Sequence, residues 1–366
     1  MLRIKSPFHG AVLNHRHGRQ TEQGLNIQVI GEAPLHDRVV VNGMEAGRAG
    51  AEFAAEITLT EKFNDIVVVS TGPNGDLEHR IRVVWDKFSK PRYRFSIDDN
   101  SFFLRDIAQN KYASLFDCHY LAALRDLNRK YGAKFALNCY YTTGPDFSIP
   151  AFPGSYRGEW QDNANWLKLS FHAYANDPDR PYQYATAEKL AHDYDLVAGE
   201  ILRFAGEATW SPPTVIHWGM TQPTAFPILR KRGVRMLSGF FRHTTGSNYD
   251  VNYWIDDVRS EYLSRHDALM DFNCGLLFSK VDIVCNCTPK ENVVPTLEPL
   301  AKDPNTAEIM DLFTHEQYFW PFYHNYVPDH AERLDVAIRF VTEKGYEPVF
   351  FHEGFLGGED WPEKSL

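Results

Sequence analysis

The sequence predicts an α/β fold, either a (β/α) barrel or an open wound sheet, preceded by a small all-β sandwich. After a polar hinge at 86–91, strand-like and helix-like patterns alternate along the rest of the chain. Before the hinge, short strand-like segments recur at roughly ten-residue spacing without a helical period. The 366 residues suffice for one large and one small domain. We therefore expect a β-sandwich over residues 1–90 and a (β/α) domain over 91–366.

The part before residue 90 consists of short segments in which apolar and polar residues alternate. Asn26–Ile30 and Phe53–Leu59 follow this two-residue period, and the pair Asn42-Gly43 is typical of a hairpin turn. Short strands separated by turns indicate a small sandwich. The run from Val39 to Ile66 resembles the bacterial immunoglobulin-like modules found beside carbohydrate-active domains, which implies an immunoglobulin-like β module.

From residue 91 onward, strands and helices are predicted in turn. Tyr120–Tyr131 has the period of a helix and is ended by Gly132, and Lys134–Tyr141 is predicted to be a strand. Further helices are predicted over Ala185–Phe204, Phe226–Arg232 and Ala331–Lys344, and further strands over Pro213–Trp218, Val234–Phe241, Val281–Cys287 and Glu347–Phe351. Because helical crossovers join parallel strands, this order predicts a parallel sheet, whose carboxyl ends collect functional residues.

Composition narrows the class of partner. The formal net charge is −10 and no cluster of Lys or Arg is visible, which argues against nucleic acid. Aromatic residues make up 14% of the chain, and because Tyr and Trp offer flat faces to sugar rings, this favours a carbohydrate as the partner.

The five cysteines show no disulfide framework, and Cys285 and Cys287 are interpreted as alternating strand residues. No stretch resembles a signal peptide or a membrane span, so we expect a cytoplasmic protein without membrane contact. Nothing predicts an oligomeric state.

Two adjacent carboxylates, Asp98 and Asp99, follow the apolar run that begins at Tyr93. Two ionised carboxylates side by side repel each other, so such a pair is expected where a metal ion or a shared proton compensates the negative charge. The alternative is a solvated turn in which Asp98 caps the next helix and Asp99 lies in water.

Two histidines also follow predicted strands. His172 comes directly after the apolar run 167–171, with Asn176 four residues on, and His217 precedes Trp218. An imidazole near the Asp pair makes a carboxylate and nitrogen site that suits zinc or another first-row divalent ion. The alternative for each is a hydrogen-bonded histidine in the core or at a strand end.

A third histidine, His315, follows the predicted strand that ends in Leu312–Thr314. It could serve as a general acid whose tautomer is set by Glu316 or Asp311, with Tyr318 as a wall of the site. The alternative is an aromatic core segment that contains a histidine. Together with the Asp pair, the three histidines describe metal-assisted hydrolysis, in which a carboxylate takes a proton and a histidine gives one.

The segment Phe95–Asn100 (FSIDDN) resembles the first motif, TFDDG, of the polysaccharide deacetylase (NodB-homology) superfamily. Tyr131–Leu137 is similar to the next strand of that family, and Leu312–His315 is similar to its late Leu-x-His motif. The resemblance implies a distorted (β/α) barrel. It also implies that Asp98 is the general base, that Asp99 binds the metal and that His315 is the general acid.

The same resemblance places His172 and Asn176 at the HxxxH metal motif of the family. Asn100 stands where the motif has Gly, and Asn176 stands where it has the second metal-binding His. His217 is therefore the candidate to supply the missing nitrogen ligand.

These observations predict a metal-dependent hydrolase that acts on a substituted carbohydrate, with zinc as the metal. The residues expected to contact the substrate are Trp218, Tyr174, Glu316 and Tyr318. One alternative is a glycoside hydrolase on a related barrel, which Glu316 or Asp256 facing Asp98 across the pocket would favour. Another is a carbohydrate-binding protein without catalytic activity.

Overall fold

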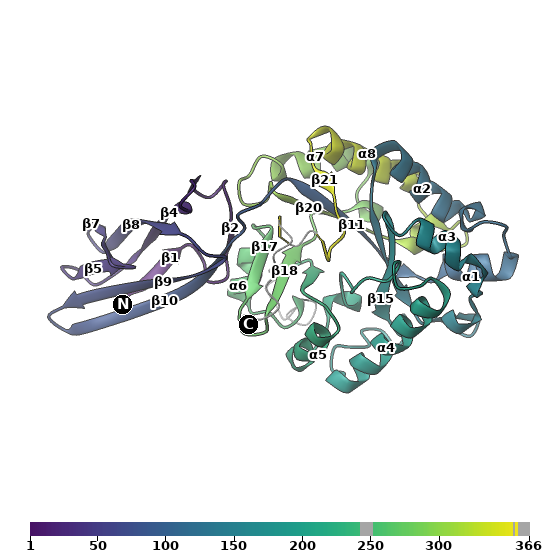
Figure 1. Cartoon of the computed structure of the whole chain (residues 1–366), viewed down its shortest axis with the longest axis horizontal. Coiled ribbons are helices and arrows are strands. Elements are labelled where there is room, and N and C mark those ends of the chain that lie inside the picture. The colour runs from purple at the N-terminus through teal and green to yellow at the C-terminus, as the bar shows by residue number, and fades with distance from the viewer. Residues whose placement is uncertain (242–251, 354–355, 358–366) are drawn as a thin grey trace. The chain divides into compact units, whose positions relative to one another are not determined.

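The computed structural model describes residues 1–241, 252–353 and 356–357 (Figure 1). Within it the chain forms two compact units. The first is mainly Met1–Lys90 and also includes Ala268–Gly275, while the second is mainly Pro91–Asp267 and Leu276–Phe355. No helix among the described residues combines the length and apolarity that a bilayer crossing requires. The predicted division of the chain at residue 90 stays a prediction.

The first unit is built from strands. They are β1 (Arg3–Ser6), β2 (Val12–Leu13), β3 (Arg19–Gln20), β4 (Leu25–Glu32), β5 (Arg38–Val41), β6 (Met44–Glu45), β7 (Gly47–Ala49), β8 (Glu52–Leu59), β9 (Phe63–Gly72), β10 (Gly75–Trp85) and β17 (Ala268–Asp271). One five-stranded sheet has the order β1-β4-β8-β7 with β3 beside β4, and another has the order β2-β10-β9-β5-β6. Along β4 and β8, buried residues alternate with more exposed ones, as predicted. The immunoglobulin-like and sandwich character stay predictions.

The predicted turn at Asn42-Gly43 is confirmed. It joins β5 to β6, whose residues Val41 and Met44 pair across it. Both turn residues have positive φ, 46° for Asn42 and 84° for Gly43. Asn and Gly tolerate this left-handed backbone, which matches the twist of a tight hairpin.

The second unit is mixed α/β and contains a sheet of parallel strands. Its strands are β11 (Arg92–Asn100), β12 (Phe135–Tyr140), β15 (Leu167–Ala173), β19 (Ile283–Val284), β20 (Ile309–His315) and β21 (Glu347–Pro348). The order is β15-β12-β11-β20-β19, with β21 beside the start of β11. All nine residues of β11 are buried, as expected for the centre of a covered parallel sheet. Among the described residues this sheet is open, so the barrel stays a prediction.

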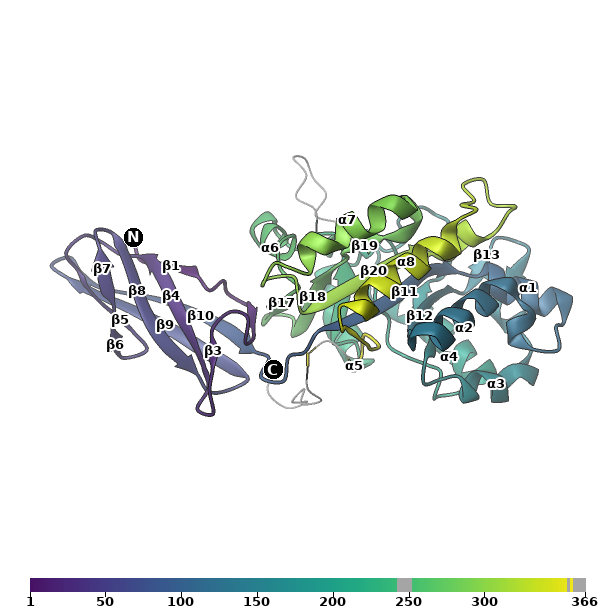
Figure 2. The ribbon, with the colours of Figure 1, turned by 90° about the horizontal axis from the view of Figure 1, so that it is seen from above.

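Helices cover this sheet. Those of the second unit are α1 (Phe102–Asn110), α2 (His119–Tyr131), α3 (Arg157–Asp162), α4 (Ala187–Phe204), α5 (Phe226–Lys231), α6 (Asp257–Leu263), α7 (Lys290–Leu300) and α8 (His330–Glu343). Figure 2 shows α7, α8 and α2 side by side, and α4 packs against β15. The predicted helix over Tyr120–Tyr131 is confirmed as α2. It buries Leu121, Leu124 and Leu127, and it ends at Gly132 with a φ of 70°.

Shorter elements complete the second unit. A second parallel pair joins β16 (Met236–Gly239) to β18 (Leu276–Lys280), and a small hairpin joins β13 (Thr142–Thr143) to β14 (Phe147–Ser148).

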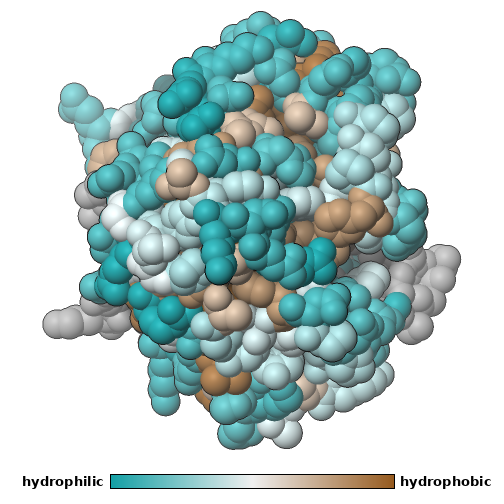
Figure 3. Space-filling view, turned by 90° about the vertical axis from the view of Figure 1, so that its right-hand side faces the viewer, coloured by the Kyte–Doolittle hydropathy of each residue, from teal (hydrophilic) through white to brown (hydrophobic). Residues whose placement is uncertain are grey.

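On the face shown in Figure 3, hydrophilic residues predominate and hydrophobic ones gather only in small groups.

Four predicted strands differ from the structure, and one of them, Val234–Phe241, shortens at both ends to β16. Pro213–Trp218 is not a strand: it is irregular up to the 3₁₀-helix η4 (His217–Gly219), because adjacent prolines cannot donate to a sheet. Val281–Cys287 shortens to β19, followed by the 3₁₀-helix η7 (Cys285–Cys287), so the interpretation of these cysteines as strand residues is wrong. Glu347–Phe351 shortens to β21, which ends at Pro348.

Candidate metal centre

The carboxyl ends of four parallel strands meet at one edge of the sheet in the second unit. Asp98 and Asp99 lie at the end of β11, Tyr140 at the end of β12, His172 near the end of β15, and His315 at the end of β20. The register pairs Asp98 directly with His315. All five side chains line one cavity of about 1330 Å³, so the expected gathering of polar residues at this edge is confirmed.

The backbone at Asp99 explains how two successive carboxylates reach the same cavity. Side chains of a regular strand alternate between its faces, but Asp99 has a φ of 61°, in the left-handed region. The pairing with β12 shifts register between Ile97 and Asn100, at the same place. A non-glycine residue held in this conformation is typical of functional sites. Asp98 and Asp99 are 4% and 9% exposed, so the alternative of a solvated turn is wrong.

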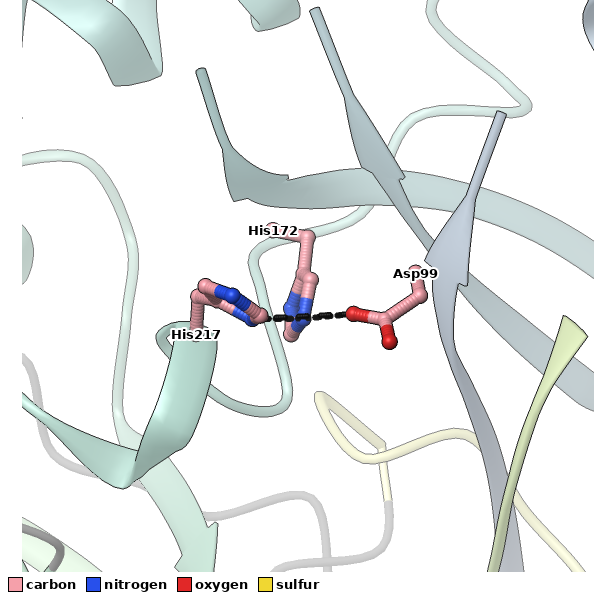
Figure 4. A group of neighbouring side chains, drawn as sticks. All are labelled: Asp99, His172 and His217. Carbon is pink, nitrogen blue, oxygen red and sulfur yellow. Dashed lines mark hydrogen bonds and ion pairs between the residues drawn. The ribbon is translucent and has the colours of Figure 1, made fainter. Parts of the chain in front are cut away.

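Asp99, His172 and His217 form a cluster with the composition of a metal site (Figure 4). His172 Nε2 lies 3.0 Å from Asp99 Oδ1 and 2.9 Å from His217 Nδ1. His217 Nδ1 lies 3.6 Å from Asp99 Oδ1. Four ligands in a zinc tetrahedron are about 3.4 Å apart. Three buried donor atoms that converge at such distances offer more lone pairs than protons, which fits a divalent cation.

The electrostatics of the cluster follow from burial and from the neighbouring charges. Burial would raise the pKa of Asp99, but the hydrogen bond from His172 and the nearby imidazoles hold it well below its usual range. For Asp98 burial prevails and raises the pKa. Burial and the neighbouring His172 lower the pKa of His217 to about 3, so its imidazole is neutral near pH 7. Asp99 and His217 are thus in the states that bind metals, a carboxylate and a neutral imidazole, whereas at His172 the effect of burial is outweighed by Asp98 and Asp99, which raise its pKa.

Polar side chains that the sequence did not single out hold the predicted ones in place. Asn138 Nδ2 donates to Asp98 Oδ1 at 2.6 Å, and Gln317 Nε2 donates to Asp99 Oδ2 at 2.7 Å. Asn286 Oδ1 lies 3.0 Å from His315 Nδ1 and can accept a hydrogen bond from it. The alternation along the strand carried a signal for one of them, because Asn138 and Tyr140 are two residues apart and face the same side.

The remaining predicted site residues are spread more widely. Tyr174, Trp218 and Tyr318 line the cavity, and the first two are 38% and 47% exposed. Asn176 also lines it but is exposed, with its Oδ1 3.4 Å from the hydroxyl of Tyr140.

Glu316 is buried and is engaged at the start of α1 rather than at the cavity. Its carboxylate accepts hydrogen bonds from the backbone N–H groups of Ser101, Phe102 and Phe103 and from the Trp320 indole. A carboxylate at this place satisfies the free N–H groups of the first helical turn, because Ser101 makes no side-chain cap.

The two other acidic residues considered from the sequence are also engaged elsewhere. Asp311 forms a buried bidentate ion pair with Arg94. Asp256 caps α6 by accepting from the backbone N–H of Arg259. The tautomer of His315 is therefore set by Asn286 rather than by Glu316 or Asp311, because its Nδ1 contacts Asn286.

No family model matches the chain, and no curated protein matches its sequence. Among solved structures, a peptidoglycan N-acetylglucosamine deacetylase is 10% identical, with 75% of this chain and 92% of that chain covered and a TM-score of 0.40. A family 4 acetyl xylan esterase from Clostridium thermocellum, in complex with a cobalt ion, is 14% identical, with 72% and 89% covered and a TM-score of 0.37. The 4-α-glucanotransferase from Thermococcus litoralis is 10% identical, with 72% and 40% covered and a TM-score of 0.45.

Proposed function

We propose that this protein is a metal-dependent hydrolase that removes an acyl group from a carbohydrate, as the sequence motifs of the polysaccharide deacetylase type imply. The observation that carries the proposal is the convergence of Asp99, His172 and His217 in a cavity that also holds Asp98 and His315. Buried titratable groups with shifted pKa values that meet in a cavity favour catalysis over passive binding.

Each polar group of the cavity has a role in this reaction. Asp99, His172 and His217 would hold the metal, for which we propose zinc, and a bound divalent ion would polarise the acyl carbonyl. Asp98 would take a proton from the attacking water, since burial raises its pKa toward the range of an effective base. Its Oδ1 is held by Asn138, and its Oδ2 lies 3.8 Å from His172 Nε2.

His315 would act from β20, the parallel strand that pairs with β11. The register places it across from Asp98, and Asn286 accepts a hydrogen bond from its Nδ1. This contact orients the ring and leaves Nε2 to exchange a proton with the departing sugar oxygen or nitrogen.

The cavity suits a sugar chain better than a small molecule. Its volume of about 1330 Å³ exceeds the upper end of ordinary ligand pockets, about 1,000 Å³. The exposed rings of Tyr174 and Trp218 line it and would stack on sugar rings. We therefore propose an acylated oligosaccharide or polysaccharide as the substrate.

Two neighbouring substitutions test the division of roles between the carboxylates. Asp99→Asn should lose bound metal and activity together, whereas Asp98→Asn should keep the metal and lose activity. The measurements are elemental analysis of the purified variants and acetate release from N-acetylated and O-acetylated oligosaccharides. Asp76→Asn, at an exposed position near the start of β10 in the first unit, is the matched control. A wild-type protein without affinity for zinc, cobalt or manganese would refute the proposal.

Deacylation is supported better than glycoside cleavage. A glycosidase needs two carboxyl groups on opposite sides of the bond, roughly 5 to 9.5 Å apart. Glu316 and Asp256, which would favour that alternative if they faced Asp98, are engaged at the starts of α1 and α6. A purely sugar-binding role would instead predict no turnover by the wild type and unchanged sugar affinity after Asp98→Ala and His315→Ala together.

A further inference from the structure

Tyr140 is a fourth side chain that reaches the cluster of Asp99, His172 and His217. It is the last residue of β12 and is 3% exposed. Its hydroxyl donates to Asp99 Oδ1 and lies 3.2 Å from each ring nitrogen of His217. The phenol oxygen thus contacts two of the three converging groups from within the cavity.

The choice of carboxylate oxygen separates Tyr140 from an ordinary supporting partner. Asp99 Oδ1 faces the two imidazole nitrogens, at 3.0 and 3.6 Å. Asp99 Oδ2 is turned away from them and accepts from Gln317. Supporting partners of a ligating carboxylate bind the oxygen that the metal leaves free, as Gln317 does. Tyr140 instead shares Oδ1, so its own oxygen lies on the side where the imidazole nitrogens converge.

We propose that Tyr140 is the fourth protein ligand of the metal, an inference that rests on the proposed metal site. The donor atoms of Asp99, His172 and His217 lie 2.9 to 3.6 Å from one another, and the Tyr140 hydroxyl lies 3.2 Å from His217 Nδ1. These distances are close to the roughly 3.4 Å that separates two ligands of a tetrahedral zinc ion. On binding, the phenol proton passes to solvent and the oxygen bonds the cation without any change of oxidation state.

This assignment gives the site a ligand set of one carboxylate, two imidazoles and one phenolate. Tyr140 takes the place that the sequence suggested for Asn176, which is exposed and lies next to the Tyr140 hydroxyl. Four protein ligands would occupy the positions of a four-coordinate ion, so Tyr140 would have to yield its place or share the ion before the substrate carbonyl could be polarised.

The test uses Cu²⁺ alone as the probe, since copper binds nitrogen and oxygen sites more tightly than the other first-row divalent ions. A phenolate ligand gives Cu²⁺ a visible charge-transfer absorption, which carboxylate and imidazole ligands do not. The wild-type protein should show this band at one equivalent of copper. Tyr140→Phe should bind copper without the band. Tyr141→Phe, the same change one residue on, should keep it, because Tyr141 stacks on Tyr174 instead.

Affinity alone would not decide the role of Tyr140, since loss of a supporting partner can also weaken a metal about 10- to 100-fold. Copper binding by the wild type without the band would overturn the inference while leaving the proposed metal site intact. Absence of copper and zinc binding would overturn both. If Tyr140→Phe does not fold, Tyr140→His supplies a nitrogen donor and should bind copper without the band. A band that persists in this variant refutes the inference.

Discussion

The buried ion pair between Arg94 and Asp311 provides a quantitative test of how the sheet holds the site. Arg94 Nε and Nη2 contact the two carboxylate oxygens of Asp311 at 2.5 and 2.6 Å, and the side chains are 0% and 2% exposed. The two residues are paired in register on β11 and β20, four positions before Asp98 and His315. Breaking the pair therefore leaves a charge without its partner inside the sheet that carries Asp98 and His315, the side chains proposed to be catalytic.

Asp311→Asn or Arg94→Met should each lower the free energy of unfolding by about 3–5 kcal/mol, because each leaves an uncompensated buried charge or polar group. The double variant should cost much less than the sum, since no buried charge then remains. The exposed pair of Arg82 and Asp65 is the matched control, and Asp65→Asn should cost less than about 1 kcal/mol.

Urea denaturation followed by circular dichroism measures these differences, with midpoints compared at equal slopes. A loss of less than about 1 kcal/mol for Asp311→Asn would refute the reasoning. So would a double variant whose cost equals the sum of the two single ones.

Three further predictions concern the edges of the site. Burial raises the pKa of Glu316 to about 7 from 4.5, so the folded state holds this proton more tightly and stability falls as pH rises through this window. Relative to Glu316→Gln, the wild type should lose about 3 kcal/mol between pH 4.5 and pH 8, measured by urea titrations; parallel curves would contradict this. Asn286→Leu removes the hydrogen-bond acceptor of His315 Nδ1 and should lower kcat at least about 10-fold without changing the metal content. An unchanged kcat would contradict the idea that this hydrogen bond orients the imidazole. Trp218→Ala should raise KM about 2- to 10-fold at nearly constant kcat if its ring stacks on the substrate, whereas an equal fall in kcat would assign it another role.

Local patterns in the sequence were sufficient for much of the secondary structure. The 3.6-residue period of Tyr120–Tyr131 and the glycine after it correspond to α2 and its left-handed end. The apolar run before Asp98 corresponds to β11, a strand that is buried at every residue. These predictions succeeded because periodicity and turn chemistry depend on residues close together in the chain. The strand predictions that failed are at places where proline or a 3₁₀ turn stands instead of the hydrogen-bonded pairing of two strands, as at Pro213–Trp218.

By itself the sequence determined that polar residues such as Asp98, Asp99 and His172 follow strands, because a strand end is a local event. Only the tertiary structure decided which of them meet. His217 joins the cluster although its segment is not a strand, whereas Asn176, four residues after His172, is exposed. Contacts such as that of Asp99 with Tyr140, or of Glu316 with the start of α1, join residues far apart in the chain. The pairing and register of the strands set those contacts, and hydrophobic patterning shows which face of a segment is buried but not which segment it packs against.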